Sequence, residues 1–358
     1  MSTQLSRATT NNTITSTANA EGSDSDVSGG EMFTLAVMVL VILASLFGNS
    51  LVIGAAYIRE SLRSPSNMLL VNLALADLGQ GIIAIPLRMT EIFNRGSKPL
   101  VPCLLVLYIT ILFFGVSMIT VALISVDRFV AIRWPFLYGN YFNHKSVPII
   151  IILAWIFMVI FSCIPYLGAG IEPEMSTKFC FYSQYLSKAY LITMFSLVNI
   201  MISVILLITN MYLLKETLRH ILKIKSQVMP MAWNGYSQTR EPTLTTNNTR
   251  SFENKKKQSF EPSNSTKARY HREVKATRVT IAIVGFTIVL TTPIMVIDLV
   301  SIWCPLCSPS IITRIAVAMA YANSCVNPWI FARFNSLYWE TYLELLKRVR
   351  NVLRCKWK

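Results

Sequence analysis

Residues 32–58 read MFTLAVMVLVILASLFGNSLVIGAAYI and contain no charged side chain. A helix needs roughly 20 apolar residues, each adding about 1.5 Å, to cross the hydrocarbon core of a bilayer. Six further stretches of comparable length are almost as apolar, namely 68–87, 101–126, 147–171, 189–214, 279–297 and 315–332. The sequence therefore predicts an all-α membrane protein built as a bundle of seven transmembrane helices.

The overall composition argues against an ordinary soluble enzyme. Hydrophobic residues make up 53% of the 358 residues and charged residues only 14%, whereas soluble domains carry about 25% charge. The net charge of +15 would suggest a nucleic-acid partner in a soluble protein. Twenty-six of the 33 basic residues, however, follow spans one, three, five or seven. Basic loops stay cytoplasmic, so we expect an outside amino terminus, an inside carboxyl terminus and no nucleic-acid partner.

The polar segments outside the spans define the remaining organisation. The amino-terminal segment is rich in Ser, Thr, Asn and Gly, which is typical of disorder, and Asn11 begins a glycosylation sequon there. The predicted domains are a disordered extracellular tail (1–31), spans one to five (32–215), a long and largely disordered third cytoplasmic loop (216–272), spans six and seven (273–334), and a short amphipathic cytoplasmic helix eight with a basic tail (335–358).

Asp77 is a carboxylate in the middle of the second span. Inserting such a charge into the membrane costs roughly 2.5–3.5 kcal/mol, so we expect a carboxylate at this depth to have a specific role. Side chains with oxygen or amide groups occur at similar depth in other spans: Asn49, Ser117, Asn323, Ser324 and Asn327. An acid among such groups suits a small hard cation or an exchangeable proton. A hydrogen-bonded packing residue is the alternative.

Two motifs end the third and seventh spans. The first is DRF at 127–129, and the second is NPWIF at 327–331. Further motif residues are Gly48, Asn49, the LALAD stretch at 73–77, Trp155, Pro293, Tyr338 and Tyr342. In their order and spacing, these motifs resemble those of the rhodopsin-like (class A) G-protein-coupled receptors. The resemblance covers nearly all of the chain outside the amino-terminal tail and the third cytoplasmic loop.

The resemblance implies an activation switch at the cytoplasmic ends of the spans. Arg128 would be held inactive by Asp127 and by an acid at the foot of span six, where Glu273 has the expected position. Activation would swing span six outward, so that a cleft opens for the carboxyl-terminal helix of a Gα subunit. Phe136 matches the apolar residue that the family inserts into Gα. The switch residues expected in span seven are Asn327, Pro328 and Phe331.

The resemblance also implies a sodium site around the buried acid of span two. Its side chains would be Asp77, Ser117, Asn323, Ser324 and Asn327. Sodium bound there would favour the inactive state of the receptor.

The cysteines fall into three groups. The resemblance implies an extracellular disulfide between Cys103 and Cys180. Cys304 and Cys307 lie in the last extracellular loop, where we favour a second disulfide over free thiols. Cys355 follows an amphipathic stretch between basic residues and is a candidate for lipidation by palmitoylation.

The third cytoplasmic loop is the predicted site of regulation. No Ser or Thr follows Tyr342, whereas the loop is rich in both. We therefore expect receptor kinases to act on the loop and arrestin to read the resulting phosphates. The alternative is that these residues only keep a linker solvated.

Several positions depart from the family pattern and bear on the ligand. Thr291 replaces the family's tryptophan in span six, and Val204 replaces the proline of span five. A retinal-binding lysine is absent because its position holds Tyr321, and Thr110 replaces the aspartate that pairs with amines, although Asp298 offers a displaced charge. The ligand, a small molecule or a peptide, is expected to contact Thr110, Phe114, Tyr182, Asp298 and Tyr321.

We therefore expect a plasma-membrane receptor that binds an extracellular ligand and activates a heterotrimeric G protein. A receptor-like protein with weak or lost signalling is the alternative, because Thr291 and Val204 alter the inner sensing surface. A channel or transporter is disfavoured, since the sequence has no internal repeat and an odd number of spans. No enzyme chemistry is expected, because no nucleophile–base pair or metal-ligating group appears.

Overall fold

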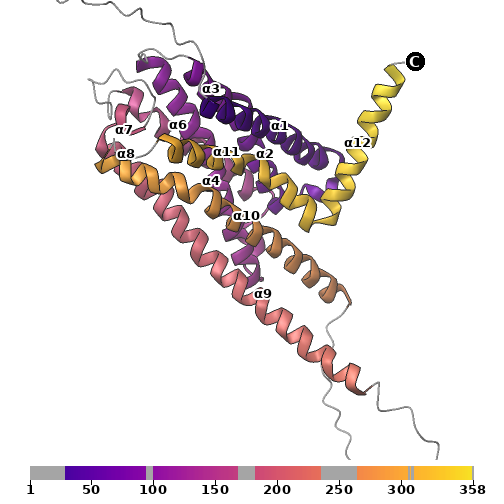
Figure 1. The fold of residues 1–358 in the computed structure, drawn as a ribbon. Coiled ribbons are helices and arrows are strands. Elements are labelled where there is room, and N and C mark those ends of the chain that lie inside the picture. Colours follow the sequence, from indigo (N-terminus) through magenta and orange to yellow (C-terminus); the bar gives the residue numbers. More distant parts are fainter. Residues whose placement is uncertain are drawn as a thin grey trace, which may run out of the picture.

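The computed structural model describes residues 29–93, 100–167, 182–234, 264–304, 307 and 310–356, and every element in these ranges is helical (Figure 1). Seven of the helical segments are long and apolar enough to cross a membrane. They are α1 (Gly29–Ile58), α2–η2–α3 (Pro65–Gly79, Gln80–Ala84, Ile85–Phe93), α4 (Leu100–Arg133), α6–η3 (Ser146–Cys163, Ile164–Leu167), α8–η4–α9 (Lys188–Met194, Phe195–Ile200, Met201–Asn234), α10 (Asn264–Trp303) and α11 (Ser310–Phe334). The predicted seven-helix bundle is thereby confirmed.

Among the described residues, three short elements and one long one lie outside these spans. They are η1 (Glu60–Leu62), α5 (Tyr138–Tyr141), α7 (Tyr182–Tyr185) and α12 (Ser336–Lys356). In Figure 1, α3, α7 and α8 gather at one end of the bundle, and α12 leaves the opposite end at a steep angle to it. We call these the Cys304 end and the Arg128 end, after one residue at each.

Several helices continue beyond the predicted apolar stretches. α9 runs on to Asn234 and α10 begins at Asn264, so both enter the segment expected to be a largely disordered loop. α1 likewise begins at Gly29, inside the expected tail. Hydropathy marks where a helix meets apolar surroundings, whereas lysine, arginine and glutamate support helix equally well in water. Helix ends are therefore underpredicted wherever the chain leaves the membrane as a polar helix.

Glycines allow two close approaches between helices. A Cβ atom at Gly48 of α1 would lie 2.8 Å from Cγ of Pro328 in α11. At Gly79 of α2 it would lie 2.0 Å from the ring of Phe113 in α4. Membrane helices gain from such small residues because close backbones increase packing contacts. These contacts bring α1 against α11 and α2 against α4.

Irregular turns interrupt two of the spans. η2 and η4 are π-helical turns, a feature that frequently marks functional sites. η4 forms although Val204 replaces the proline expected shortly after it. The π-helical turn of this span is therefore present although the proline is missing.

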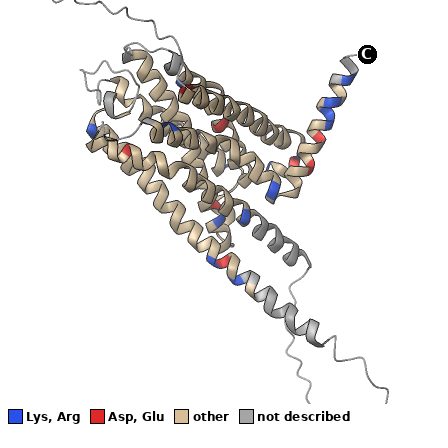
Figure 2. Cartoon of the chain, viewed as in Figure 1, with Lys and Arg blue, Asp and Glu red and all other residues tan. Residues whose placement is uncertain are grey.

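The first half of α12 is anchored on the bundle. Glu344 accepts a hydrogen bond from Arg59 at 2.7 Å and another from Arg348 at 2.7 Å. The Leu345 side chain approaches Gly54 of α1 closely. Figure 2 shows Lys and Arg on α12 and on the parts of α9 and α10 toward the Arg128 end, while the middle of the bundle is almost uncharged.

Candidate functional site

Three elements meet around Arg128, at the end of the bundle that we named after it. Arg128 of α4 donates from Nε to Oδ2 of Asp127 at 2.7 Å and from Nη2 to Oγ of Ser66 in α2 at 2.6 Å. The hydroxyl of Tyr138, in α5, donates to Oδ1 of Asp127 at 2.7 Å. Arg128 is 7% exposed and Asp127 1%. We call these four residues the Arg128 cluster.

Tyr138 takes part in the cluster as a neutral phenol. Burial is the main cause that raises its pKa to about 12; the Asp127 carboxylate raises it further and Arg128 opposes the shift. The hydroxyl therefore stays protonated at neutral pH and keeps its bond to Asp127. The guanidinium carbon of Arg128 also lies 5.9 Å from the centroid of the Tyr138 ring. Burying this charge is tolerable because a carboxylate and two hydroxyls surround it.

Sequence reasoning found only two members of the cluster. Asp127 and Arg128 were recognised from their motif, whereas Ser66 and Tyr138 were missed. Tyr138 follows Phe136 in the same short connection, and a polar hydroxyl there was the one available clue. No pattern marks Ser66, because a lone serine near the start of a helix is ordinary.

The other expected switch residues lie in different settings. Phe136 is 98% exposed between α4 and α5. Phe331 is fully buried, and its ring centroid lies 5.6 Å from that of Tyr338 in α12. Pro328 packs against Gly48, as described above. Glu273 lies on α10, but its side chain is outside the described part of the structure, so its contact with Arg128 stays a prediction.

A second polar group surrounds Asp77 near the middle of the bundle. Ser117 of α4 donates to Oδ1 of Asp77 at 2.9 Å, and Asn327 of α11 donates from Nδ2 to Oδ2 at 2.8 Å. All three side chains are buried. The carboxylate is thereby hydrogen-bonded from two further helices, and we call these residues, with Asn323 and Ser324, the Asp77 cluster.

Within the described residues, the side chains of Asn323 and Ser324 bond to partners other than Asp77. Oδ1 of Asn323 accepts from the hydroxyl of Thr287 in α10 at 3.2 Å. The hydroxyl of Ser324 donates to the carbonyl of Tyr321 one turn earlier, at 2.8 Å. Thr287 was not singled out from the sequence. It links α10 to the Asp77 cluster.

The donor chemistry of the Asp77 cluster fits a small hard cation. One carboxylate and several neutral hydroxyl and amide oxygens are the ligands that such ions prefer. Asn49 donates to the carbonyl of Ser324 at 2.9 Å, while its own Oδ1 is buried and accepts no hydrogen bond within the described ranges. Among the described residues, no group of three or more His, Cys, Asp or Glu could hold a metal.

Charged and phenolic groups from four elements meet toward the Cys304 end. They are Arg88 of α3, Asp298 of α10, Tyr182 of α7 and Tyr321 of α11. Burial raises the pKa of Tyr182 well above its usual value; the Tyr321 hydroxyl and the Asp298 carboxylate raise it further, and Arg88 opposes them. We call these residues the Arg88–Asp298 cluster.

This cluster contains three of the five expected ligand contacts. Thr110 instead bonds its hydroxyl to the carbonyl of Val106 in its own helix, at 2.7 Å. Phe114 is partly buried against the main hydrophobic core. Arg88 was missed, because it had been counted only among the basic residues of one face. Its position in a span whose only other charged residue is Asp77 was the sequence feature that could have identified it.

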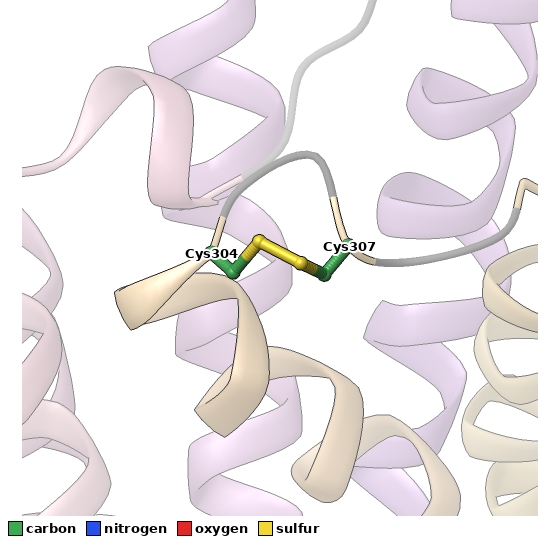
Figure 3. The surroundings of a disulfide bond; sticks show 2 residues. All are labelled: Cys304 and Cys307. Carbon is green, nitrogen blue, oxygen red and sulfur yellow. A yellow bond between two sulfur atoms is a disulfide. The ribbon is translucent and has the colours of Figure 1, made fainter.

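The cysteines give one complete disulfide in the described residues. Cys304, at the end of α10, is bonded to Cys307 in the connection to α11 (Figure 3). Cys103 is also disulfide-bonded, but Cys180 lies outside the described residues, so that pairing stays a prediction. The Cys355 side chain, Asn11 and the middle of the third loop likewise lie outside them.

Comparisons with known proteins agree with this architecture. The family model for the 7 transmembrane receptor (rhodopsin family) matches residues 48–331. Adenosine receptor A2a of Homo sapiens is 23% identical over 337 residues, covering 90% of this chain and 73% of that receptor. The same receptor of Canis lupus familiaris is 24% identical over 324 residues, covering 87% and 71%.

A third relative matches a shorter region. The 5-hydroxytryptamine receptor 2B of Dichotomyctere fluviatilis is 31% identical over 125 residues, which is 34% of this chain and 26% of that protein. The match thus spans about a quarter of that receptor's length.

Proposed function

Because the chain belongs to the rhodopsin family of seven-transmembrane receptors, we propose that it binds an extracellular ligand at the Cys304 end and activates a heterotrimeric G protein at the Arg128 end. The family makes it a multi-pass membrane protein with an extracellular ligand and a G protein as partners. It is not an enzyme. The plasma membrane as its location, with the amino terminus outside, rests on the distribution of its basic residues.

The buried guanidinium of Arg128 is the observation that carries this proposal. Arg128 holds its charge at the mouth of the bundle by bonding to Asp127 and Ser66. Such a group can leave only if another partner compensates it, because an unpaired buried charge is costly. The carboxyl-terminal helix of Gα would supply that partner, with Phe136 as an exposed apolar contact beside it. Glu273 would act as a second acid that holds α10 closed.

The Asp77 cluster supports sodium as an allosteric ion. Asp77, Ser117 and Asn327 would hold it, with Asn323 and Ser324 around them. A bound cation stabilises the arrangement in which these groups converge, so it favours the inactive state. The opsins of this family bind retinal through a lysine, whereas this chain has Tyr321 at that position, so retinal is not part of the proposal.

The long third loop and α12 support three further partners. Phosphorylation of the loop's Ser and Thr residues by receptor kinases would create an anionic surface for arrestin. α12 carries exposed apolar side chains together with basic residues, a pattern that lies on anionic membrane lipid. Lipidation of Cys355 would strengthen that attachment.

A receptor-like protein with weak signalling is the second candidate function. Thr291 stands where the family has a tryptophan, and its hydroxyl bonds back to the carbonyl of Thr287 at 2.7 Å rather than to another helix. A side chain that bonds only within its own helix transmits a movement of that helix to its neighbours less effectively than an aromatic ring that packs between helices.

Guanine-nucleotide exchange separates the two functions. The full chain in lipid nanodiscs is mixed with purified heterotrimers of each Gα class, and exchange is compared with that of empty nanodiscs. A receptor accelerates exchange on at least one class without added ligand, because a minor active population exists at equilibrium. Exchange equal to that of empty discs for every class, with and without a ligand library, would leave the receptor-like alternative.

A further inference from the structure

One buried hydroxyl of α4 bonds to a neighbouring helix. Oγ of Ser125 lies 2.5 Å from Oγ1 of Thr209 in α9, and both side chains are buried. The Thr209 hydroxyl donates to the carbonyl of Ile205 in its own helix at 2.7 Å. Because a hydroxyl carries a single proton, Thr209 can only accept from Ser125, and Ser125 is the donor. The bond between α4 and α9 therefore has a fixed direction.

Two other buried hydroxyls in the spans bond within their own helix. Ser162 donates to the carbonyl of Met158 and Thr120 to the carbonyl of Val116, each at 2.6 Å and four residues earlier. Serine in a helix commonly bonds back in this way. For Ser125, the acceptor four residues earlier is the carbonyl of Val121. Ser125 can therefore exchange its bond to α9 for a bond within α4 without leaving its proton unsatisfied.

The Ser125–Thr209 bond lies one turn before Arg128. On the next turn of the same two helices, the rings of Phe129 and Tyr212 pack edge to face with their centroids 4.9 Å apart. An aromatic contact of this kind persists over a range of ring separations, whereas a hydrogen bond weakens steeply when its distance and angle change. The polar contact is therefore the one that fixes α9 beside Arg128.

We propose that the Ser125–Thr209 hydrogen bond restrains α9 in the inactive arrangement, and that Ser125 exchanges it for a bond within α4 on activation. Both are positioning residues, which act on the switch through the placement of α9. The inference rests on the proposed receptor function, since it adds a restraint on the same cytoplasmic opening. The bonds described for Arg128 connect α4 to Ser66 of α2, whereas this bond connects α4 to α9.

Nucleotide exchange tests the restraint in the full chain in nanodiscs. Ser125→Ala and Thr209→Val should each raise ligand-free exchange about fivefold, because one hydrogen bond between neutral groups is lost. The double variant should show no larger increase than either single variant, since both changes remove the same bond. Thr209→Ser keeps the acceptor and should behave like the wild type. Ser162→Ala is the matched control, because it loses only bonds within α6, and its exchange should be unchanged.

Electron spin resonance tests the position of α9 without a G protein. Spin labels are attached to Leu218→Cys in α9 and Tyr57→Cys in α1, both at exposed positions, in chains whose other free cysteines are replaced by serine. The distribution of distances between the labels should broaden in Ser125→Ala and in Thr209→Val. It should match that of the wild type in Ser162→Ala.

Two results would overturn the proposal. The first is a label distance distribution that neither Ser125→Ala nor Thr209→Val changes. The second is exchange that stays at the wild-type level in both variants while their unfolding temperatures fall, because the bond would then only stabilise the fold. Absence of exchange by the wild type would instead count against the receptor function, and the label distances would still test the restraint on α9.

Discussion

The Arg128 cluster and the Arg88–Asp298 cluster each contain a guanidinium and a carboxylate, but they are built differently. Asp127 and Arg128 are neighbours on one helix, joined by a bond of 2.7 Å and almost completely buried. Arg88 and Asp298 come from α3 and α10 and remain partly exposed. The first pair is fixed by local geometry, and in the proposed function it opens when a Gα subunit replaces a partner. The distance between the second guanidinium and its carboxylate depends on how two helices are spaced.

The Asp77 cluster lies near the middle of the bundle and is joined to α10 by hydrogen bonds through α11. Thr287 of α10 donates to Asn323 of α11, and Asn327 of α11 donates to Asp77. α10 therefore reaches the central polar group through a hydrogen bond between side chains. In this account, a displacement of α10 at the Cys304 end first changes the hydrogen bonds of the Asp77 cluster and then those of Arg128.

Removing the carboxylate of the Arg128 cluster should have the largest effect. Asp127→Ala removes the carboxylate that accepts a hydrogen bond from the buried guanidinium, and breaking such an ion pair costs about 3 kcal/mol or more. We expect ligand-free nucleotide exchange to rise at least tenfold and the unfolding temperature to fall. Unchanged exchange at equal receptor concentration would mean that the local pair does not restrain the active state.

The next largest effect should come from the hydroxyl that closes the same cluster. Tyr138→Phe removes a hydrogen bond to a charged acceptor, which is worth about 1.5–3 kcal/mol, and leaves the ring in place. Ligand-free exchange should rise roughly tenfold. Tyr141→Phe is the matched control, because Tyr141 is exposed in the same short helix. Equal exchange by the two variants would remove Tyr138 from the switch.

Asp77→Asn tests whether the middle cluster responds to sodium independently of both ends. The wild type should unfold at a higher temperature in sodium chloride than in choline chloride at equal ionic strength, and the variant should not. Asparagine retains an acceptor for Ser117 but removes the charge that a cation needs. A sodium effect that survives in Asp77→Asn would show that Asp77 is a packing residue.

The smallest effect should come from the link between α10 and the centre. Thr287→Val keeps the shape of the side chain and removes the hydrogen bond to Asn323, worth about 1 kcal/mol. Exchange should rise about fivefold, and its suppression by sodium should weaken. Thr291→Val is the control, because it loses only a bond within α10. If both variants behave alike, the hydrogen bond between the helices carries no coupling.

The sequence predicts the parts of this architecture that depend on neighbouring residues. The seven spans follow from continuous apolar stretches, and the Asp127–Arg128 pair follows from adjacency. The polar extension of α9 to Asn234 was missed, because hydropathy does not detect a helix in water. Ser66 and Arg88 were missed because each acts through partners on distant helices. A single polar residue in a helix shows no pattern that identifies such a partner.

The departures from the family pattern at Thr291 and Val204 show a second limit of prediction from the sequence. Both were interpreted as losses relative to the family. The π-helical turn η4 nevertheless forms without the proline, and Thr287, one turn before Thr291, donates a hydrogen bond to Asn323. A sequence shows which side chain is absent. It does not show which local contact takes its place.

Charge reversal at Arg128 tests the central claim most directly. Nucleotide exchange on the responsive Gα class is measured for the wild type, Arg128→Glu and Arg133→Glu, the last being a control at the exposed end of the same helix. The account predicts exchange at the level of empty nanodiscs for Arg128→Glu and near that of the wild type for Arg133→Glu. Exchange by Arg128→Glu equal to that of the wild type would contradict it.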